Sequence, residues 1–190
     1  MAEEQRGGTG RSEAPSQGQA FRKEERPLTF PSMASRPEPD FTLDVFHRSL
    51  LTASVAVAVL ISAYTLLQVP SMPEEVPIHW SLSGTVSYGS RSTVVLIALT
   101  LLPIVIGTAV LTRFPKIFNF PFELSKDNAQ RQYRNAVQML VWVTAALTVM
   151  STGLYLPWLL GNENIVLVHV GTAVLVASMV FFVVRMYKLR

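Results

Sequence analysis

Residues 50–69 read LLTASVAVAVLISAYTLLQV and contain no Asp, Glu, Lys or Arg. At about 1.5 Å rise per residue, a helix of this length matches a hydrocarbon core of about 30 Å. Inside lipid, every backbone N–H and C=O must find its partner within the segment. The stretch is therefore predicted to be a helix that crosses the bilayer, and it decides the fold class.

Three further runs share this length and composition, and they cover residues 93–111, 136–156 and 165–184. The connections between the runs are short, so consecutive spans are expected to lie side by side in opposite directions. The sequence predicts an all-α membrane protein whose four transmembrane helices form an antiparallel bundle. A short ordered outer loop is expected at residues 70–92.

Residues 1–45 differ from the rest of the 190-residue chain, because they hold eight Asp or Glu, six Lys or Arg, five Pro and four Gly. Such a segment cannot bury enough apolar surface to offset its chain entropy. We predict a disordered cytoplasmic tail at 1–45 and a four-span membrane domain at 46–190. The tail has no apolar signal core, so the first span is expected to act as its own insertion signal.

Lys and Arg are distributed unevenly between the connecting segments. Seven precede the first span, and one lies between the first and second spans. Five lie between the second and third spans, none lies between the third and fourth, and three follow the fourth. The positive-inside rule then predicts a plasma-membrane protein with both termini in the cytoplasm and with loops 70–92 and 157–164 outside. Nucleic acid is not an expected partner, because the cations that give a pI near 9.4 lie where membrane topology requires them.

Small or moderate side chains recur at every fourth position on two spans. They are Ser54, Ala58 and Ser62 on the first span and His169, Ala173 and Ala177 on the fourth. Small residues at this spacing let the backbones of neighbouring helices approach closely in lipid. Both faces are therefore predicted to be buried against protein. Trp80, Tyr155 and Trp158 fall near the outer boundary, where aromatic rings are typical interfacial anchors.

The outer loop is the most informative connection. Pro70, Pro73 and Pro77 exclude a helix from its first half. Residues 76–82 alternate apolar and mostly polar positions, which favours a short half-buried strand. Gly84 and Gly89 offer positions for turns. We expect a small fixed cap on the outer face of the bundle.

Residues 72–80 read MPEEVPIHW and are followed by Ser83-Gly84 and by Tyr88-Gly-Ser-Arg91 at the start of a span. This string resembles the signature of a bacterial membrane domain of unknown function, which also forms the N-terminal part of SdpI-type bacteriocin-immunity proteins. A second run, Phe118-Asn-Phe-Pro121 with Asn128 and Tyr133, is similar to residues that follow the domain in longer relatives. The resemblance implies a non-enzymatic protein of the immunity or sensing type.

The resemblance also implies that the outer loop recognises a peptide, a small molecule or a membrane protein. The candidate ligand-binding residues are Ile78, Trp80 and Tyr88 for apolar contacts, His79 and Arg91 for polar contacts, and Gly84. The lipid bilayer is a partner by virtue of the fold. The oligomeric state is left open by the sequence.

Two imidazoles are candidate metal ligands. His79 lies in the outer loop near Glu74 and Glu75, and His169 is the one His, Asp, Glu, Lys or Arg inside a predicted span. The alternative is that each imidazole hydrogen-bonds a nearby carbonyl or loop group. The chain has no Cys, phosphate loop, nucleophile elbow or metalloprotease motif, so neither enzymatic activity nor a cofactor is expected.

Two other functions stay open. The chain can be a small transporter or channel subunit that acts as an oligomer, with a path lined by Thr65, Thr100, Thr148 and His169. It can also be an accessory subunit of a larger membrane complex. Solute flux in vesicles and purification in mild detergent distinguish these functions from ligand recognition at the loop.

Overall fold

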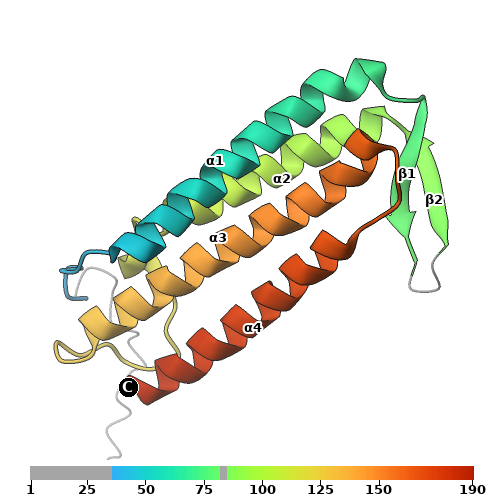
Figure 1. Cartoon of the computed structure of the whole chain (residues 1–190). Helices are drawn as coiled ribbons and strands as arrows, with labels where there is room; N and C mark the ends of the chain where they lie inside the picture. The colour runs from blue at the N-terminus through green and yellow to red at the C-terminus, as the bar shows by residue number, and fades with distance from the viewer. Residues whose placement is uncertain (1–35, 82–84) are drawn as a thin grey trace, which may run out of the picture. The chain divides into compact units, whose positions relative to one another are not determined.

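The structure is a computed structural model that describes residues 36–81 and 85–190. The elements in these residues are α1 (Val45–Gln68), η2 (Val69–Ser71), β1 (Glu75–Trp80), β2 (Val86–Ser90), α2 (Ser92–Leu111), η3 (Pro115–Ile117), α3 (Ala129–Leu160) and α4 (Val166–Lys188) (Figure 1). Of the described helices, four are long and apolar enough to cross a membrane. The predicted membrane fold of packed helices is confirmed.

The helices begin and end at residues whose chemistry accounts for the boundary. The Asp44 carboxylate accepts a hydrogen bond from the His47 backbone N–H at 3.1 Å, so Asp44 caps α1 and its pKa is lowered by this bond. The helix α3 ends before Gly161, whose φ of 63° lies in the left-handed region that glycine adopts without strain. The helix α3 begins at Ala129, before the predicted span at 136. Its first two turns are polar, so they were not part of the apolar run that predicted the span.

The helix α3 is the centre of the arrangement. It packs against α1, α2 and α4, whereas α4 packs chiefly on α3, and Figure 1 shows α3 between α4 and the α1–α2 pair. The sequence predicted the bundle but did not indicate which helix lies at its centre. The central position of α3 follows from the buried side chains, which are far more numerous on the described part of α3 than on α4.

Polar side chains on α3 donate hydrogen bonds to the backbones of its neighbours, although the side-chain oxygens of Gln132 and Asn135 have no partner among the described residues. The Gln132 amide donates to the Met186 carbonyl of α4 at 3.0 Å, and the Asn135 amide donates to the Phe182 carbonyl at 3.0 Å. The Thr148 hydroxyl lies 3.2 Å from the Ser54 carbonyl of α1. Hydrogen bonds of this kind hold helices together in lipid, where burial of apolar surface does not drive their association.

The two predicted small-residue faces have different outcomes. On α1 the face of Ser54, Ala58 and Ser62 is buried, as predicted. On α4 the prediction is wrong, because His169, Ala173 and Ala177 are exposed. The helix instead presents Gly171, Ser178, Phe182 and Met186 to the interior.

Two glycines explain which face of α4 meets α3. A Cβ atom added at Gly171 would lie 2.9 Å from the Ala146 carbonyl oxygen, and one added at Gly153 would lie 2.6 Å from the Val168 backbone nitrogen. The two backbones therefore approach more closely than any side chain at these positions permits. This close approach fixes the rotation of α4 and turns Ala173 outward.

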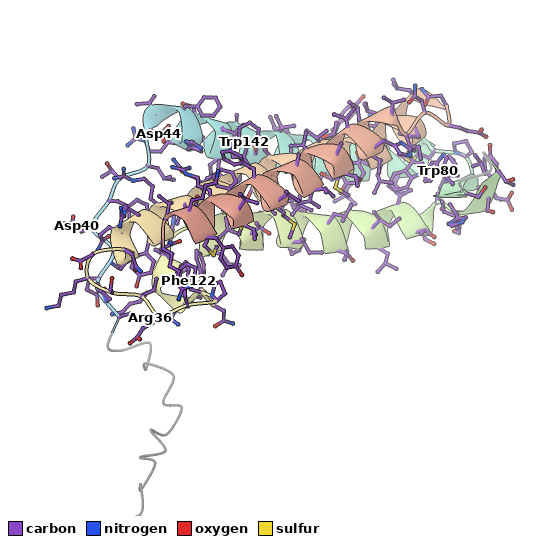
Figure 2. The ribbon with its side chains drawn as sticks, turned by 90° about the horizontal axis from the view of Figure 1, so that it is seen from below. Arg36, Asp40, Asp44, Trp80, Phe122 and Trp142 are labelled. Atoms are coloured by element: carbon purple, nitrogen blue, oxygen red, sulfur yellow. The ribbon has the colours of Figure 1, made fainter. Side chains whose placement is uncertain are left out.

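Residues 36–44, here named the N-terminal arm, pack on the end of the helices away from the hairpin. The Asp40 backbone N–H donates to the Gln130 side chain at 2.7 Å, and the Tyr133 hydroxyl donates to the Pro37 carbonyl at 3.1 Å. Arg36 donates to the Phe118 carbonyl at 2.7 Å. Figure 2 shows Arg36 and Asp40 at this arm end and Trp80 at the opposite, hairpin end.

The tail prediction therefore has two parts. Residues 1–35 lie outside the described residues, so their disorder stays a prediction. The arm, in contrast, is part of the packed structure. It contacts Tyr133, and the ring of Tyr133 also packs against Phe120 with centroids 5.9 Å apart. Both residues belong to the second run that the sequence analysis singled out.

The glycine contact predicts a difference between two matched variants. Gly171→Ala should destabilise the protein by about 1–3 kcal/mol, because the new methyl group displaces backbone atoms of α3. Gly107→Ala is the control, since a Cβ atom there meets no atom within 4 Å. Loss of helical circular dichroism during titration with a denaturing detergent measures both variants. Equal stability of the two variants would contradict the close approach of α3 and α4.

Candidate functional site

The outer loop folds as an antiparallel hairpin. Val76 pairs with Gly89 and Pro77 with Tyr88, after which a register shift lets His79 pair with Ser87. The predicted strand is present as β1, whereas its partner β2 was not predicted. A Cβ atom added at Gly89 would lie 2.5 Å from the Ile78 side chain. The absence of a side chain at Gly89 therefore lets the Ile78 side chain of β1 pack against β2.

The hairpin is attached to the helices through a small apolar core. Met72 and Val76 are buried together with Val94 and Ala98 of α2 and with Tyr155 and Trp158 of α3. Burial of this kind contributes about 25 cal/mol for each Å² of apolar surface removed from water. The core fixes the base of the hairpin on the start of α2 and the end of α3.

Tyr155 and Trp158 were predicted to be interfacial anchors, and this prediction is wrong. Their exposed fractions are 0% and 5%. The Trp158 indole N–H donates to the Pro77 carbonyl at 2.6 Å, so it bonds the hairpin rather than lipid headgroups. An aromatic residue near the end of a span can anchor the helix at the lipid headgroups or pack against a neighbouring loop, and the sequence alone does not distinguish these two roles.

Glu163, in the connection between α3 and α4, holds the distal part of the hairpin. Its backbone carbonyl accepts a hydrogen bond from the Trp80 indole at 3.1 Å, and its carboxylate accepts one from the Tyr88 hydroxyl. The bond to the carboxylate is the main reason that the pKa of Tyr88 is raised. The sequence analysis assigned no role to Glu163, although it is the one acidic residue in the loop 157–164.

A cleft of about 480 Å³ lies between the hairpin and the end of α3. Its walls include two carboxylates and two aromatic rings, together with the apolar side chains of the strand. These residues are Glu75, Val76, Pro77, Tyr88, Trp158 and Glu163. Carboxylates beside aromatic faces favour a positively charged group. The cleft is therefore the candidate functional site of the described structure.

The candidate ligand-binding residues have different places in this arrangement. Tyr88 lines the cleft and is 52% exposed. Arg91 donates to the Met72 carbonyl at 2.9 Å and so fixes the segment that leads from α1 into the hairpin. Ile78 is partly buried against the hairpin core, and His79 is exposed. Gly84 lies outside the described residues. Of the described candidates, Tyr88 is the one that the cleft brings together with Glu75 and Glu163.

His169 has a partner within its own helix. Its Nδ1 atom lies 3.1 Å from the Ile165 carbonyl oxygen, which matches the alternative reading of this imidazole. In the part of the chain that the structure describes, no group of three or more His, Cys, Asp or Glu side chains gathers to hold a metal ion. A metal bound by His79 and His169 stays a prediction.

The residues proposed to line a transport path lie in different environments. Thr65 and Thr148 are buried, whereas Thr100 and His169 are exposed. The Thr100 hydroxyl donates to the Leu96 carbonyl of its own helix at 2.8 Å. Within one chain these four side chains therefore do not share an interior path, and a path through an oligomer stays a prediction.

Comparison with known proteins found a match to a family model over part of the chain. Residues 56–107 match the model of a domain of unknown function, DUF1648. No curated protein and no solved structure matches the chain. The matched residues include β1, β2, about half of α1 and most of α2, so they build one wall of the cleft. Trp158 and Glu163 come from outside the match.

The bond between Tyr88 and Glu163 predicts a change in titration. The ordinary pKa of tyrosine is about 10. Because the carboxylate favours the protonated phenol, the contact is complete below that value and is lost as the pH rises through the raised pKa. Glu163→Gln should therefore lower the pKa of Tyr88, which ¹³C-tyrosine NMR measures after assignment with Tyr88→Phe.

Glu74→Gln is the matched control for this titration. It removes one carboxylate from the same end of the molecule but not from the walls of the cleft. The Tyr88 titration should change little in this variant. A Tyr88 pKa that is the same in wild type and Glu163→Gln would disprove the contact.

Proposed function

We propose that the protein is a non-enzymatic multi-pass membrane protein that binds a cationic peptide in the cleft at its hairpin end. The observation that carries the proposal is the pairing of Glu75 and Glu163 with Tyr88 and Trp158 around one open cavity. The ligand would place a Lys or Arg side chain, or an N-terminal amine, between the carboxylates. Recognition rather than catalysis follows, because these groups offer a binding surface and no activated nucleophile.

The charge distribution supports an outward-facing cleft in the plasma membrane. Arg91 is the one Lys or Arg in residues 70–92 and 157–164, whereas residues 112–135 and 185–190 hold eight. By the positive-inside rule, the arm end faces the cytoplasm and the hairpin end faces outward. A ligand would then reach the cleft without crossing the membrane.

The chemistry of the walls supports a cation. The hairpin-end segments contain Glu74, Glu75 and Glu163 against Arg91 alone. One oxygen of the Glu163 carboxylate accepts from Tyr88, and a carboxylate has further lone pairs for a second donor. A ligand cation placed over the Tyr88 or Trp158 ring would add about 0.5–1 kcal/mol of cation–π attraction.

The size of the cleft supports recognition of a peptide side chain and its flanking backbone. Small-molecule sites measure about 300–1,000 Å³, and the cleft lies in the lower part of that range. The resemblance to the immunity-type proteins adds support for a peptide ligand. On this proposal, the protein senses or sequesters a membrane-active cationic peptide before it reaches the bilayer.

The proposal predicts charge-dependent binding to the purified protein in lipid nanodiscs made of zwitterionic lipid. A lysine-containing hexapeptide with one aromatic residue should bind, and Glu75→Gln together with Glu163→Gln should weaken binding at least tenfold. Each lost charge-assisted contact costs about 1.5–3 kcal/mol. Isothermal titration calorimetry at two salt concentrations measures the effect. Glu74→Gln and a peptide with Glu in place of Lys are the controls.

Survival of a peptide-sensitive bacterium tests the biological part of the proposal. Cells that express the protein should survive a bacteriocin challenge better than cells that express the double glutamine variant at the same level. His79→Ala should retain protection, because its side chain is not a wall of the cleft. Peptide binding that is unaffected by both glutamine substitutions would refute the cleft as the binding site.

A further inference from the structure

A second cavity lies at the other end of the molecule, between α1 and α2. It measures about 420 Å³ and is lined on α1 by Val55 and Ala56 and on α2 by Ile106 and Ala109. Thr112 and Arg113, which follow α2, complete the mouth. The groove is therefore apolar along the two helices and cationic at one end.

A second cation lies beside the mouth of this groove. Arg48 precedes Thr52, another lining residue, by one helical turn and so lies on the same face of α1. Because α1 begins and α2 ends at the arm end, Arg48 in the first turn of α1 and Arg113 two residues after α2 both belong to this end of the molecule. Both residues are exposed.

Neither arginine forms a salt bridge with an acidic residue of the described part of the chain. Among the residues that the structure describes, the salt bridges join His47 to Asp44 and Lys116 to Glu38. Arg36 donates to backbone carbonyls of the loop between α2 and α3. Arg48 and Arg113 thus leave two positive charges at the groove that have no partner in the described part of the chain.

The dimensions match the upper part of a lipid. Val55 and Ile106 each lie two helical turns from the nearer arginine, which corresponds to about 10 Å along the helix axis. The apolar lining therefore begins at the level of the headgroups and continues into the hydrocarbon region. The small side chains of Ala56 and Ala109 leave the space that an acyl chain would fill.

We propose that this groove is a binding site for an anionic glycerophospholipid of the inner leaflet. The phosphate would lie between Arg113 and Arg48, and one acyl chain would lie along Ala56 and Ala109. Basic pockets between transmembrane helices on the cytoplasmic side bind anionic headgroups in this way. The site is separate from the cleft, so either can fail without the other.

Native mass spectrometry of the full chain in detergent tests the site, with phosphatidylglycerol and phosphatidylcholine of the same acyl chains as probes. Phosphatidylglycerol should remain bound at higher collision energy and bind more tightly. Arg113→Gln and Arg48→Gln should each reduce its affinity about fivefold, the contribution expected of one cation near an anionic headgroup. Arg131→Gln, an exposed cation of α3 that does not line the groove, should leave it unchanged.

A second pair of variants tests the acyl-chain contact. Ala56→Trp fills the groove and should abolish the preference for phosphatidylglycerol, whereas Ala63→Trp, on an exposed part of α1 outside the groove, should retain it. Equal binding of the two lipids by the wild-type protein would overturn the proposal. Equal losses in Arg131→Gln and Arg113→Gln would do the same, because they would indicate attraction to the whole basic surface.

Discussion

Side chains of α3 donate hydrogen bonds to backbone carbonyls of α1 and α4, and the positions of the other described elements follow from this arrangement. In lipid a polar group on a helix surface raises the free energy of the protein unless it has a hydrogen-bond partner. Gln132, Asn135 and Thr148 therefore require neighbouring helices that supply acceptors. At one end of the same helix, Trp158 donates a hydrogen bond to the hairpin. At the other end the helix contacts the N-terminal arm through Gln130 and Tyr133.

The two ends of α3 therefore carry different surfaces. At the hairpin end, Glu75 and Glu163 face a cleft with aromatic walls, and the local charge is negative. At the arm end, Arg48 and Arg113, which form no salt bridge within residues 36–81 and 85–190, flank an apolar groove, and the local charge is positive. This asymmetry supports both the proposed orientation in the membrane and the proposed ligands, a cationic peptide outside and an anionic lipid inside.

The spans were predictable because charge is excluded from runs of about 20 residues, a constraint that acts on each segment alone. Contacts between segments were less predictable. On α4, Ala173 and Gly171 are both small, and the close approach to Ala146 and Met150 decides which of them is buried.

The hairpin illustrates the same limit. Alternation in residues 76–82 indicated one strand, but the second strand depends on the space at Gly89 for Ile78. The cleft lies at the loop that holds the predicted ligand-binding residues, and Tyr88 is among those that line it. Glu163 and Trp158 were missed as site residues because they reach the hairpin from the end of α3 and the connection after it, far away in sequence. Nothing local marks such a contact.

The α3 helix holds the hairpin in place as one wall of the cleft, through the bond from Trp158 to the Pro77 carbonyl. Hydrogen–deuterium exchange of the β1 and β2 amides, measured in lipid nanodiscs, tests this attachment. We expect slow exchange of the paired amides in the wild-type protein and faster exchange in Trp158→Phe, because Trp158 bonds the Pro77 carbonyl. Trp142→Phe should exchange like the wild type, because Trp142 packs near Phe46 at the arm end. Exchange at the rate of an unstructured peptide, or equal rates in wild type and Trp158→Phe, would contradict this attachment.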